Sequence, residues 1–219
     1  AGTAIVGTVS GNAISFGSPV VWEAANGKRC RIVYDTNAQK VVIAYTDDGN
    51  SGYGTAIVGT VSGTSISFGS PVVFRSSDTI VYDITYDSNA QKVVIAHRYQ
   101  QSPYGGYGIV GTVSGTSISF GSPTVFNNAT TGRIRAAYDT NAQRVVFAYE
   151  DAGNSSHGTA VVGTVSGTGI SFGSEVVFEA AQSSEIGMTY DPDSQKIVIG
   201  YRDQGDSNIG KAIVEYCRR

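Results

Sequence analysis

The sequence predicts an all-β protein, a four-bladed β-propeller in which each blade is one tandem repeat. The strings GTVSG and ISFGS each occur four times, and every recurrence lies 52 residues after the last, at Gly7, Gly59, Gly111, Gly163 and at Ile14, Ile66, Ile118, Ile170. The 28 glycines stand among many Ser, Thr, Val and Tyr residues, a composition typical of short strands joined by turns. A period of this length with several strands in each copy is typical of propeller blades.

The repeats divide the chain without insertions. We assign residues 1–219 to one domain, with copies at approximately 1–52, 53–104, 105–156 and 157–208. Residues 209–219 begin a fifth copy and align with residues 1–11. No segment shows helical periodicity over a useful length.

Each copy is expected to contain four strands. In the second copy the first strand covers 80–86 and ends at the turn 87–90, whose Asp and Asn favour hydrogen bonds to their own backbone. The next strands are expected at 92–98, at 108–113 and, after the turn 114–116, at 117–126.

The two ends of the chain are expected to close the ring. The N-terminus begins with the third and fourth strands of a blade, and the C-terminus supplies the first three, so joining them would remove an exposed sheet edge. One third strand is then in excess, and either 1–9 or 209–217 lies outside the slot, adds a fifth strand or pairs with another chain.

Composition excludes several classes of protein. The net charge of −3 argues against non-specific nucleic-acid binding, and no apolar run is long enough for a membrane helix. The N-terminal residues do not have the pattern of a signal peptide. The cysteines, Cys30 and Cys217, lack zinc-site spacing, and whether either is bonded stays open.

The blade pattern resembles that of sialidase-type β-propellers. A Tyr-Asp turn is followed by a VVIAY strand, an IVGTVSG strand and a last strand containing Ser-Pro-Val-Val, as at 18–21 and 70–73. The resemblance spans the whole chain at the level of blade architecture and implies the propeller fold. The full Asp-box motif is absent, the only Trp is Trp22, and no catalytic residue carries over.

Comparison of the copies identifies one variable face. The turns between first and second strands barely vary, whereas the residues entering the first strand and leaving the second strand differ in charge. Loops on a rigid scaffold are the usual location of binding residues. The candidate ligand-binding residues on this face are Arg29, Arg31, Tyr82, Asp83, His97, Arg98, Arg133, Arg135, Glu150, Glu185 and Arg202.

Two interpretations compete at these positions. In a four-bladed ring the first and third copies face each other, so two arginine pairs would surround the channel mouth and bind a carboxylate, sulfate or phosphate. Alternatively, the arginines pair with Asp83 and Glu185 as a structural collar. The Asp47-Asp48-Gly49-Asn50 segment is interpreted as a turn, because it lacks the order of a calcium loop, and we expect no metal and no cofactor.

The leading function is non-enzymatic, lectin-like recognition of glycans or another small acidic ligand. The first alternative is a glycoside hydrolase or polysaccharide lyase acting on acidic sugars at one composite site. The second is a structural or attachment repeat protein. The chain is expected to be a monomer or small homo-oligomer, secreted or on an extracellular or virion surface.

Overall fold

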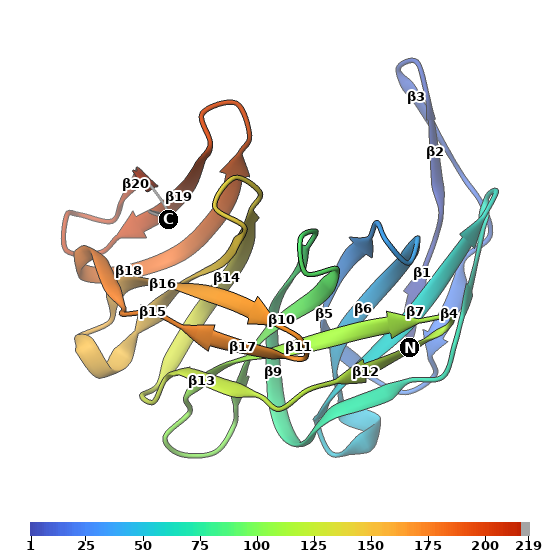
Figure 1. Cartoon of the computed structure of the whole chain (residues 1–219), viewed down its shortest axis with the longest axis horizontal. Helices are drawn as coiled ribbons and strands as arrows, with labels where there is room; N and C mark the ends of the chain where they lie inside the picture. Colours follow the sequence, from blue (N-terminus) through green and yellow to red (C-terminus); the bar gives the residue numbers. More distant parts are fainter. Residues whose placement is uncertain (216–219) are drawn as a thin grey trace.

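The computed structural model describes residues 1–215, which are built from antiparallel strands (Figure 1). Two three-residue 3₁₀ turns, η1 (Asp48–Asn50) and η2 (Ala152–Asn154), are the only helical segments in this described part. The all-β prediction is therefore confirmed. No helix in residues 1–215 has the length and apolar character needed to cross a bilayer.

The strands form four repeating sheet units, A to D, preceded by an N-terminal unit. The N-terminal unit contains β1 (Gly2–Ala4), β2 (Gly7–Ser10), β3 (Ala13–Phe16) and β4 (Val20–Glu23). Unit A contains β5 (Gly27–Asp35), β6 (Lys40–Asp47), β7 (Tyr53–Ser62), β8 (Ser65–Phe68) and the start of β9 (Val72–Asp87). Unit B contains the rest of β9, β10 (Lys92–Tyr99), β11 (Gly106–Ser114), β12 (Ser117–Phe120) and β13 (Thr124–Asn127).

The same pattern continues through the C-terminal half. Unit C contains β14 (Thr131–Asp139), β15 (Arg144–Asp151), β16 (His157–Ser166), β17 (Gly169–Phe172) and the start of β18 (Val176–Asp191). Unit D contains the rest of β18, β19 (Lys196–Asp203) and β20 (Ile209–Glu215). Because β9 pairs with both β7 and β10, and β18 with both β16 and β19, units A and B share one sheet and units C and D another.

The turn between the first and second strands has the hydrogen bonding expected of its Asp. Oδ1 of Asp87 accepts hydrogen bonds from the amides of Asn89 and Ala90, at 3.0 and 2.9 Å, and the turn at Asp139 is built the same way. The last strand of each copy, by contrast, is broken in two. In unit B, Gly121-Ser122-Pro123 separates β12 from β13, and in unit C Gly173-Ser174-Glu175 separates β17 from β18, so the break does not depend on the proline.

Each sheet has two apolar faces, and the units stack face to face. In unit A the inner strands alternate so that Val42 and Ala44 face unit B, where they contact Val93 and Ile95. The same contacts recur between units B and C and between units C and D. The core is therefore a series of layers between sheets.

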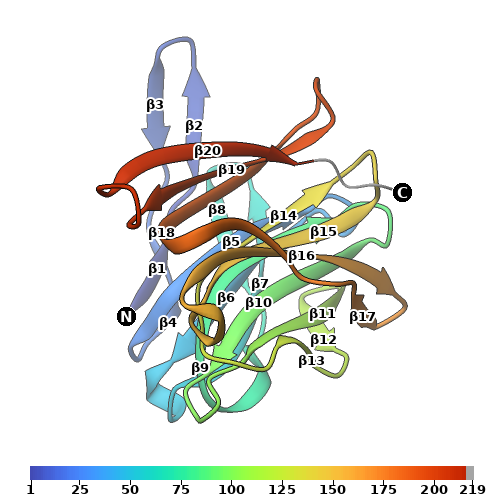
Figure 2. The same ribbon diagram turned by 90° about the vertical axis from the view of Figure 1, so that its left-hand side faces the viewer.

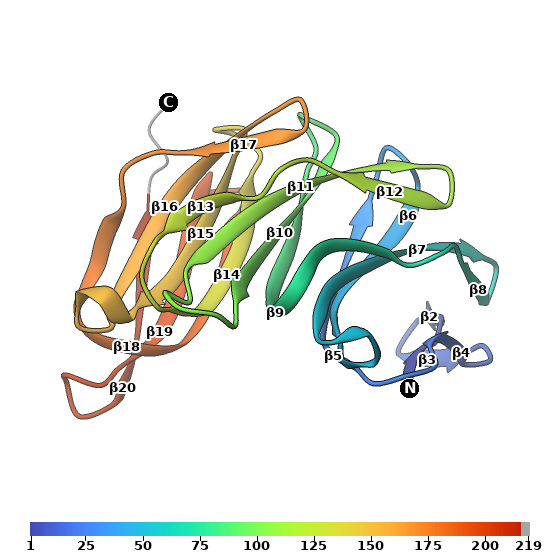
Figure 3. The same cartoon turned by 90° about the horizontal axis from the view of Figure 1, so that it is seen from below.

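The units follow one another along an open arc. Figures 1 and 3 show unit D at one end and the N-terminal unit at the other, and Figure 2, taken along the arc, shows the sheets one behind another. Among the described residues β20 pairs only with β19, and β4 pairs only with β1. The expected pairing of the terminal strands into a closed ring is thus not present in residues 1–215.

Candidate functional site

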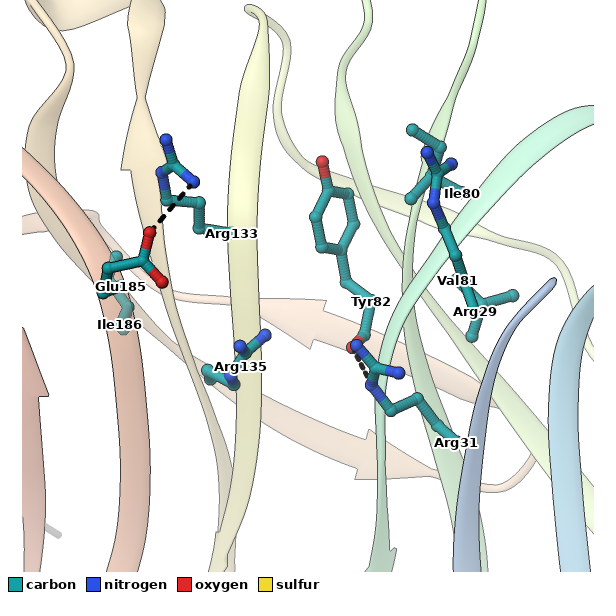
Figure 4. A pocket seen from close by; sticks show the side chains of 9 residues that line it. All are labelled: Arg29, Arg31, Ile80, Val81, Tyr82, Arg133, Arg135, Glu185 and Ile186. Carbon is teal, nitrogen blue, oxygen red and sulfur yellow. Dashed lines mark hydrogen bonds and ion pairs between the residues drawn. The ribbon is translucent and has the colours of Figure 1, made fainter.

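One cavity collects side chains from all four copies. Its volume is about 290 Å³, and it is lined by Arg29, Arg31, Ile80, Val81, Tyr82, Arg133, Arg135, Glu185 and Ile186 (Figure 4). All come from the beginning of the innermost strand of each unit, the region that differs most in charge between copies. Six of the eleven predicted site residues therefore lie around one hollow.

A β-bulge in the innermost strand orients these side chains. The pairing register shifts between Lys28 and Arg31, and the equivalent shift occurs in units C and D. The bulged residues Arg29, Arg133 and Glu185 have φ of 52°, 53° and 50°, a left-handed conformation that is uncommon outside glycine. Bulges redirect side chains next to binding sites, and here they turn long charged groups toward the cavity.

Arg31 and Arg135 are fixed by carbonyl groups rather than by acids. Nε of Arg31 donates to the Tyr82 carbonyl at 2.7 Å, and an Nη1 of each arginine donates to the carbonyl of its own preceding residue. No carboxylate within residues 1–215 forms an ion pair with either guanidinium. Both side chains are therefore held in place without a direct ion pair.

Asp83 connects units B and C through the backbone. Its Oδ1 accepts the Ile84 amide and its Oδ2 accepts the Ala136 amide, both at 2.9 Å. Burial raises the pKa of Asp83, against smaller opposing effects of these amides and of the Arg135 and Arg31 charges. Asp83 forms no direct ion pair with an arginine among the described residues, and each of its oxygens accepts a backbone amide. At this residue the expected collar is therefore limited to longer-range attraction by the Arg135 and Arg31 charges.

Among residues 1–215, Arg133 is the one arginine of the four that forms ion pairs with carboxylates. Its Nε lies 2.8 Å from Oε2 of Glu150, and its Nη1 lies 3.9 Å from Oε1 of the well-exposed Glu185. Glu150 stands behind Arg133 and does not line the cavity. Arg29, in contrast, makes no hydrogen bond or ion pair with any described residue. The cavity therefore carries a net positive charge.

The expected opposition of the first and third copies takes a different form. Strands β5, β9, β14 and β18 line the arc in sequence order, and Figure 4 shows Tyr82 between the arginine pair of the first copy and that of the third. The two pairs border one concave surface.

His97 lies in the core, outside the lining of the cavity. Its side chain is fully buried, with ring centroids 5.4 Å from Phe74 and 5.9 Å from Tyr107. Burial lowers the pKa of His97 to about 3, so the imidazole is neutral at physiological pH. It has no access to a ligand in the cavity.

Arg98 and Arg202 also lie outside the cavity lining. Arg98 donates to the Thr131 carbonyl and to Oε1 of Gln100, both at 3.0 Å, and its guanidinium lies 5.7 Å from the Tyr82 ring centroid. It therefore links unit B to unit C behind Tyr82. Arg202 is exposed near the end of β19.

Sequence comparison missed a set of buried tyrosine–carboxylate pairs. The Tyr45 hydroxyl donates to Glu23 at 3.0 Å, and Tyr201 donates to Glu179 at 2.9 Å. Burial and the carboxylate raise the pKa of Tyr201 to about 12. In the second copy His97 replaces the tyrosine while Arg75 replaces the glutamate, and that joint change is a signal of packing that was available in the sequence.

The acidic turns are structural. Asp151 Oδ1 accepts the Gly153 amide at 3.0 Å, and Asp203 Oδ1 accepts the Gly205 amide at 2.8 Å. No group of three or more His, Cys, Asp or Glu side chains in residues 1–215 is arranged to hold a metal ion. Cys30 is an exposed free thiol, and Cys217 lies outside the described residues.

Comparisons with known proteins support the fold alone. No protein-family model matches the chain, and no curated protein matches it. A crystal structure of a protein of unknown function from Dyadobacter fermentans DSM 18053 is similar, with a TM-score of 0.62 and 12% sequence identity. The similarity covers 91% of this chain and 64% of that one, so this chain spans less than two thirds of the longer protein.

Proposed function

We propose that the cavity binds an anionic ligand, with an acidic glycan as the class that fits best. The observation that carries this proposal is the set of four arginines around one hollow, three of which form no ion pair with any described residue. A guanidinium presents a planar fork of donors suited to carboxylate, sulfate and phosphate groups. Two of the arginines are already fixed by carbonyls, which lowers the entropy cost of binding.

The dimensions and lining support a sugar carrying an acidic group. A volume of about 290 Å³ is at the lower end of the range for small-molecule pockets. Tyr82 offers an aromatic face beside the arginines, and such faces pack against sugar rings. The proposed ligand is therefore about the size of one or two sugar rings bearing a carboxylate or sulfate.

Binding without catalysis is favoured over glycoside hydrolysis or polysaccharide lysis. A glycosidase generally needs two carboxyl groups flanking the scissile bond. Glu185 is the one carboxylate in the lining, and Glu150 is engaged by Arg133 behind it. We further propose that units A to D are propeller-type blades. We also propose that the protein presents this lectin-like site on an extracellular or particle surface.

Anion-dependent stabilisation tests the proposal. Sulfate or phosphate should raise the melting temperature more than chloride at equal ionic strength, because a ligand that binds only the folded state stabilises it by RT ln(1 + [L]/Kd). At ten times the Kd this is about 1.4 kcal/mol, or roughly 3–6 °C for a chain of this size. A glycan array with sialylated, uronic and sulfated members then identifies the ligand class.

Matched charge removals provide the control. The R31A/R135A double variant should lose the excess response to sulfate. The K40A/K92A double variant removes the same charge from the opposite face, beside the turns between first and second strands, and should keep the response. An equal sulfate response in the native chain and in R31A/R135A would overturn the assignment of the site.

A further inference from the structure

The third strand of each repeat carries a glycine, and an aromatic ring packs on this glycine in four of the five cases within the described residues. Trp22 lies on Gly2, Phe74 on Gly54, Phe126 on Gly106 and Phe178 on Gly158, each so close that a Cβ atom on the glycine would overlap the ring. Gly210 in β20 is the fifth glycine of this series. Among the described residues nothing lies within 4 Å of the position that its Cβ would take. The surface of β20 at Gly210 is therefore open to packing by an aromatic side chain of a fourth strand.

Unit D also exposes a face that is buried in the other units. Val198, Gly200, Ala212 and Val214 are equivalent to Val42, Ala44, Ala56 and Val58, all of which are fully buried against unit B. Val214 is 53% exposed. The outer edge of β20 has no strand partner within residues 1–215.

Unit A exposes the complementary face at the other end of the arc. Ile32 is 62% exposed, whereas Ile84, its equivalent in unit B, is 7% exposed because unit A covers it. The N-terminal unit covers only the outer part of this face, through Trp22 and Ala4. A cavity of about 190 Å³ remains beside Ile32 and Cys30.

Tyr34 is a third position that lacks its usual neighbour. The hydroxyl of Tyr86 accepts the Asn37 amide of the preceding unit at 3.3 Å, and the hydroxyl of Tyr138 accepts the Asn89 amide at 3.2 Å. By the same 52-residue correspondence, Tyr34 would accept the amide of Asp193, which lies in the turn before β19 of unit D. The exposed faces of units D and A are therefore two halves of one interface that the chain builds three times internally.

From these matched surfaces we infer that two copies of this chain associate head to tail. Unit D of one copy packs on unit A of the next, and its β20 takes the place of β1 beside β4. Trp22 then rests on Gly210 of the neighbouring copy instead of on Gly2. The exchange is feasible because β1 pairs with β4 at only three positions, and Gly210-Lys211-Ala212 corresponds to Gly2-Thr3-Ala4.

The open arc favours a second copy over closure within one chain. Units A and D lie at opposite ends of the arc in Figures 1 and 3, with units B and C packed between them. A head-to-tail contact between unlike surfaces gives a ring when its rotation closes and a filament when it does not. Two copies in a ring would supply about eight blades, which is within the known range for propellers.

Light scattering after size exclusion tests the association. The native chain should have a mass of two or more copies, increasing with concentration if the assembly is a filament. G210V should be monomeric because its side chain occupies the position where the Trp22 ring would pack. I32K should be monomeric because it places a charge in the interface. Both substitutions lie at positions that are open in the single chain. G169V is the matched control in an outer strand and should associate as the native chain does.

Mixing the two monomeric variants separates association from closure within a chain. The I32K variant keeps an intact unit D, and the G210V variant keeps an intact unit A, so an equimolar mixture should form a 1:1 dimer through the one remaining pair of native surfaces. The inference is overturned if the native chain is monomeric at all concentrations, or if the mixture stays monomeric while the native chain associates. A monomeric native chain with slow hydrogen exchange throughout β5 would indicate closure within one chain and would equally overturn it.

Discussion

Arg133 lies 2.8 Å from Glu150, whereas Arg29, which occupies the same position in the first copy, has Thr46 where the glutamate would be. The Thr46 hydroxyl donates to the Thr79 carbonyl and supplies no charge. Two arginines in equivalent bulges therefore differ in whether their charge is compensated. This difference separates a structural guanidinium from one that is available to a ligand.

Removal of Arg29 and removal of Arg133 should affect different properties of the protein. R29A should weaken anion binding and leave the free energy of unfolding within about 0.5 kcal/mol of the native value, because Arg29 has no partner to lose. R133A should destabilise the fold by about 1 kcal/mol, since it leaves the largely covered Glu150 carboxylate unpaired. Urea titrations and calorimetric titration with sulfate measure the two effects. Equal loss of stability in both variants would contradict the distinction.

Burial of His97 should make the fold less stable in acid. The unfolded chain takes up a proton on His97 near pH 6.5, whereas burial keeps the folded imidazole neutral until about pH 3. The unfolded state therefore binds more protons in this window, and stability should fall as the pH drops from 6.5 toward 3, by up to about 1.4 kcal/mol per pH unit.

The H97F variant isolates this contribution. Phenylalanine keeps the packing against Phe74 and Tyr107 but does not titrate. Unfolding free energies at pH 7, 5 and 4 should decline less steeply in H97F than in the native chain, with both affected alike by the carboxylates. Parallel declines in the two proteins would show that His97 is not buried as a neutral group.

Sequence periodicity predicted the strands well because the repeat is nearly exact and its turns are chemically distinctive. The turn at 87–90 and the strand at 92–98 follow directly from Asp87 and the β-branched run after it. Periodicity does not encode the rotation between neighbouring units, so the open arc could not be predicted from the spacing of 52. That rotation depends on how Val42 and its equivalents pack between sheets.

The candidate site was predictable to the extent that equivalence between copies brings residues together. Arg29, Tyr82 and Glu185 occupy neighbouring register positions, and the structure gathers them in one cavity. Comparison of the copies predicts His97 on the same face, because a position that diverges between copies is a candidate for ligand contact. Its divergence instead accompanies that of Arg75, whose guanidinium lies 3.7 Å from the Tyr99 ring centroid, so the change belongs to the packing of unit B.

The tyrosine–carboxylate pairs should contribute modestly to stability at neutral pH and more visibly at high pH. Y149F removes the 2.7 Å hydrogen bond to Glu175 and should cost about 1 kcal/mol. Burial and Glu175 raise the pKa of Tyr149 above its usual range, so the folded state keeps a proton that the unfolded chain loses near pH 10. The native fold should therefore lose stability above pH 10, and this loss should be smaller in Y149F when both are followed by urea unfolding. A loss of the same size in both would mean that another group causes it.

The glycine of the third strand should be indispensable only where a ring rests on it. In G158A the new methyl group would overlap Phe178 and approach Oγ of the buried Ser183, so we expect a loss of about 1–3 kcal/mol. G210A places the same methyl group at an equivalent position where nothing lies within 4 Å among the described residues, and the stability of the single chain should change by less than about 0.5 kcal/mol. Urea unfolding at low protein concentration, where association does not contribute, measures both values. Because both sites carry the same substitution in the same strand of the repeat, intrinsic strand propensity cancels in the comparison. A large destabilisation by G210A in dilute solution would show that an aromatic ring already packs on Gly210 within one chain.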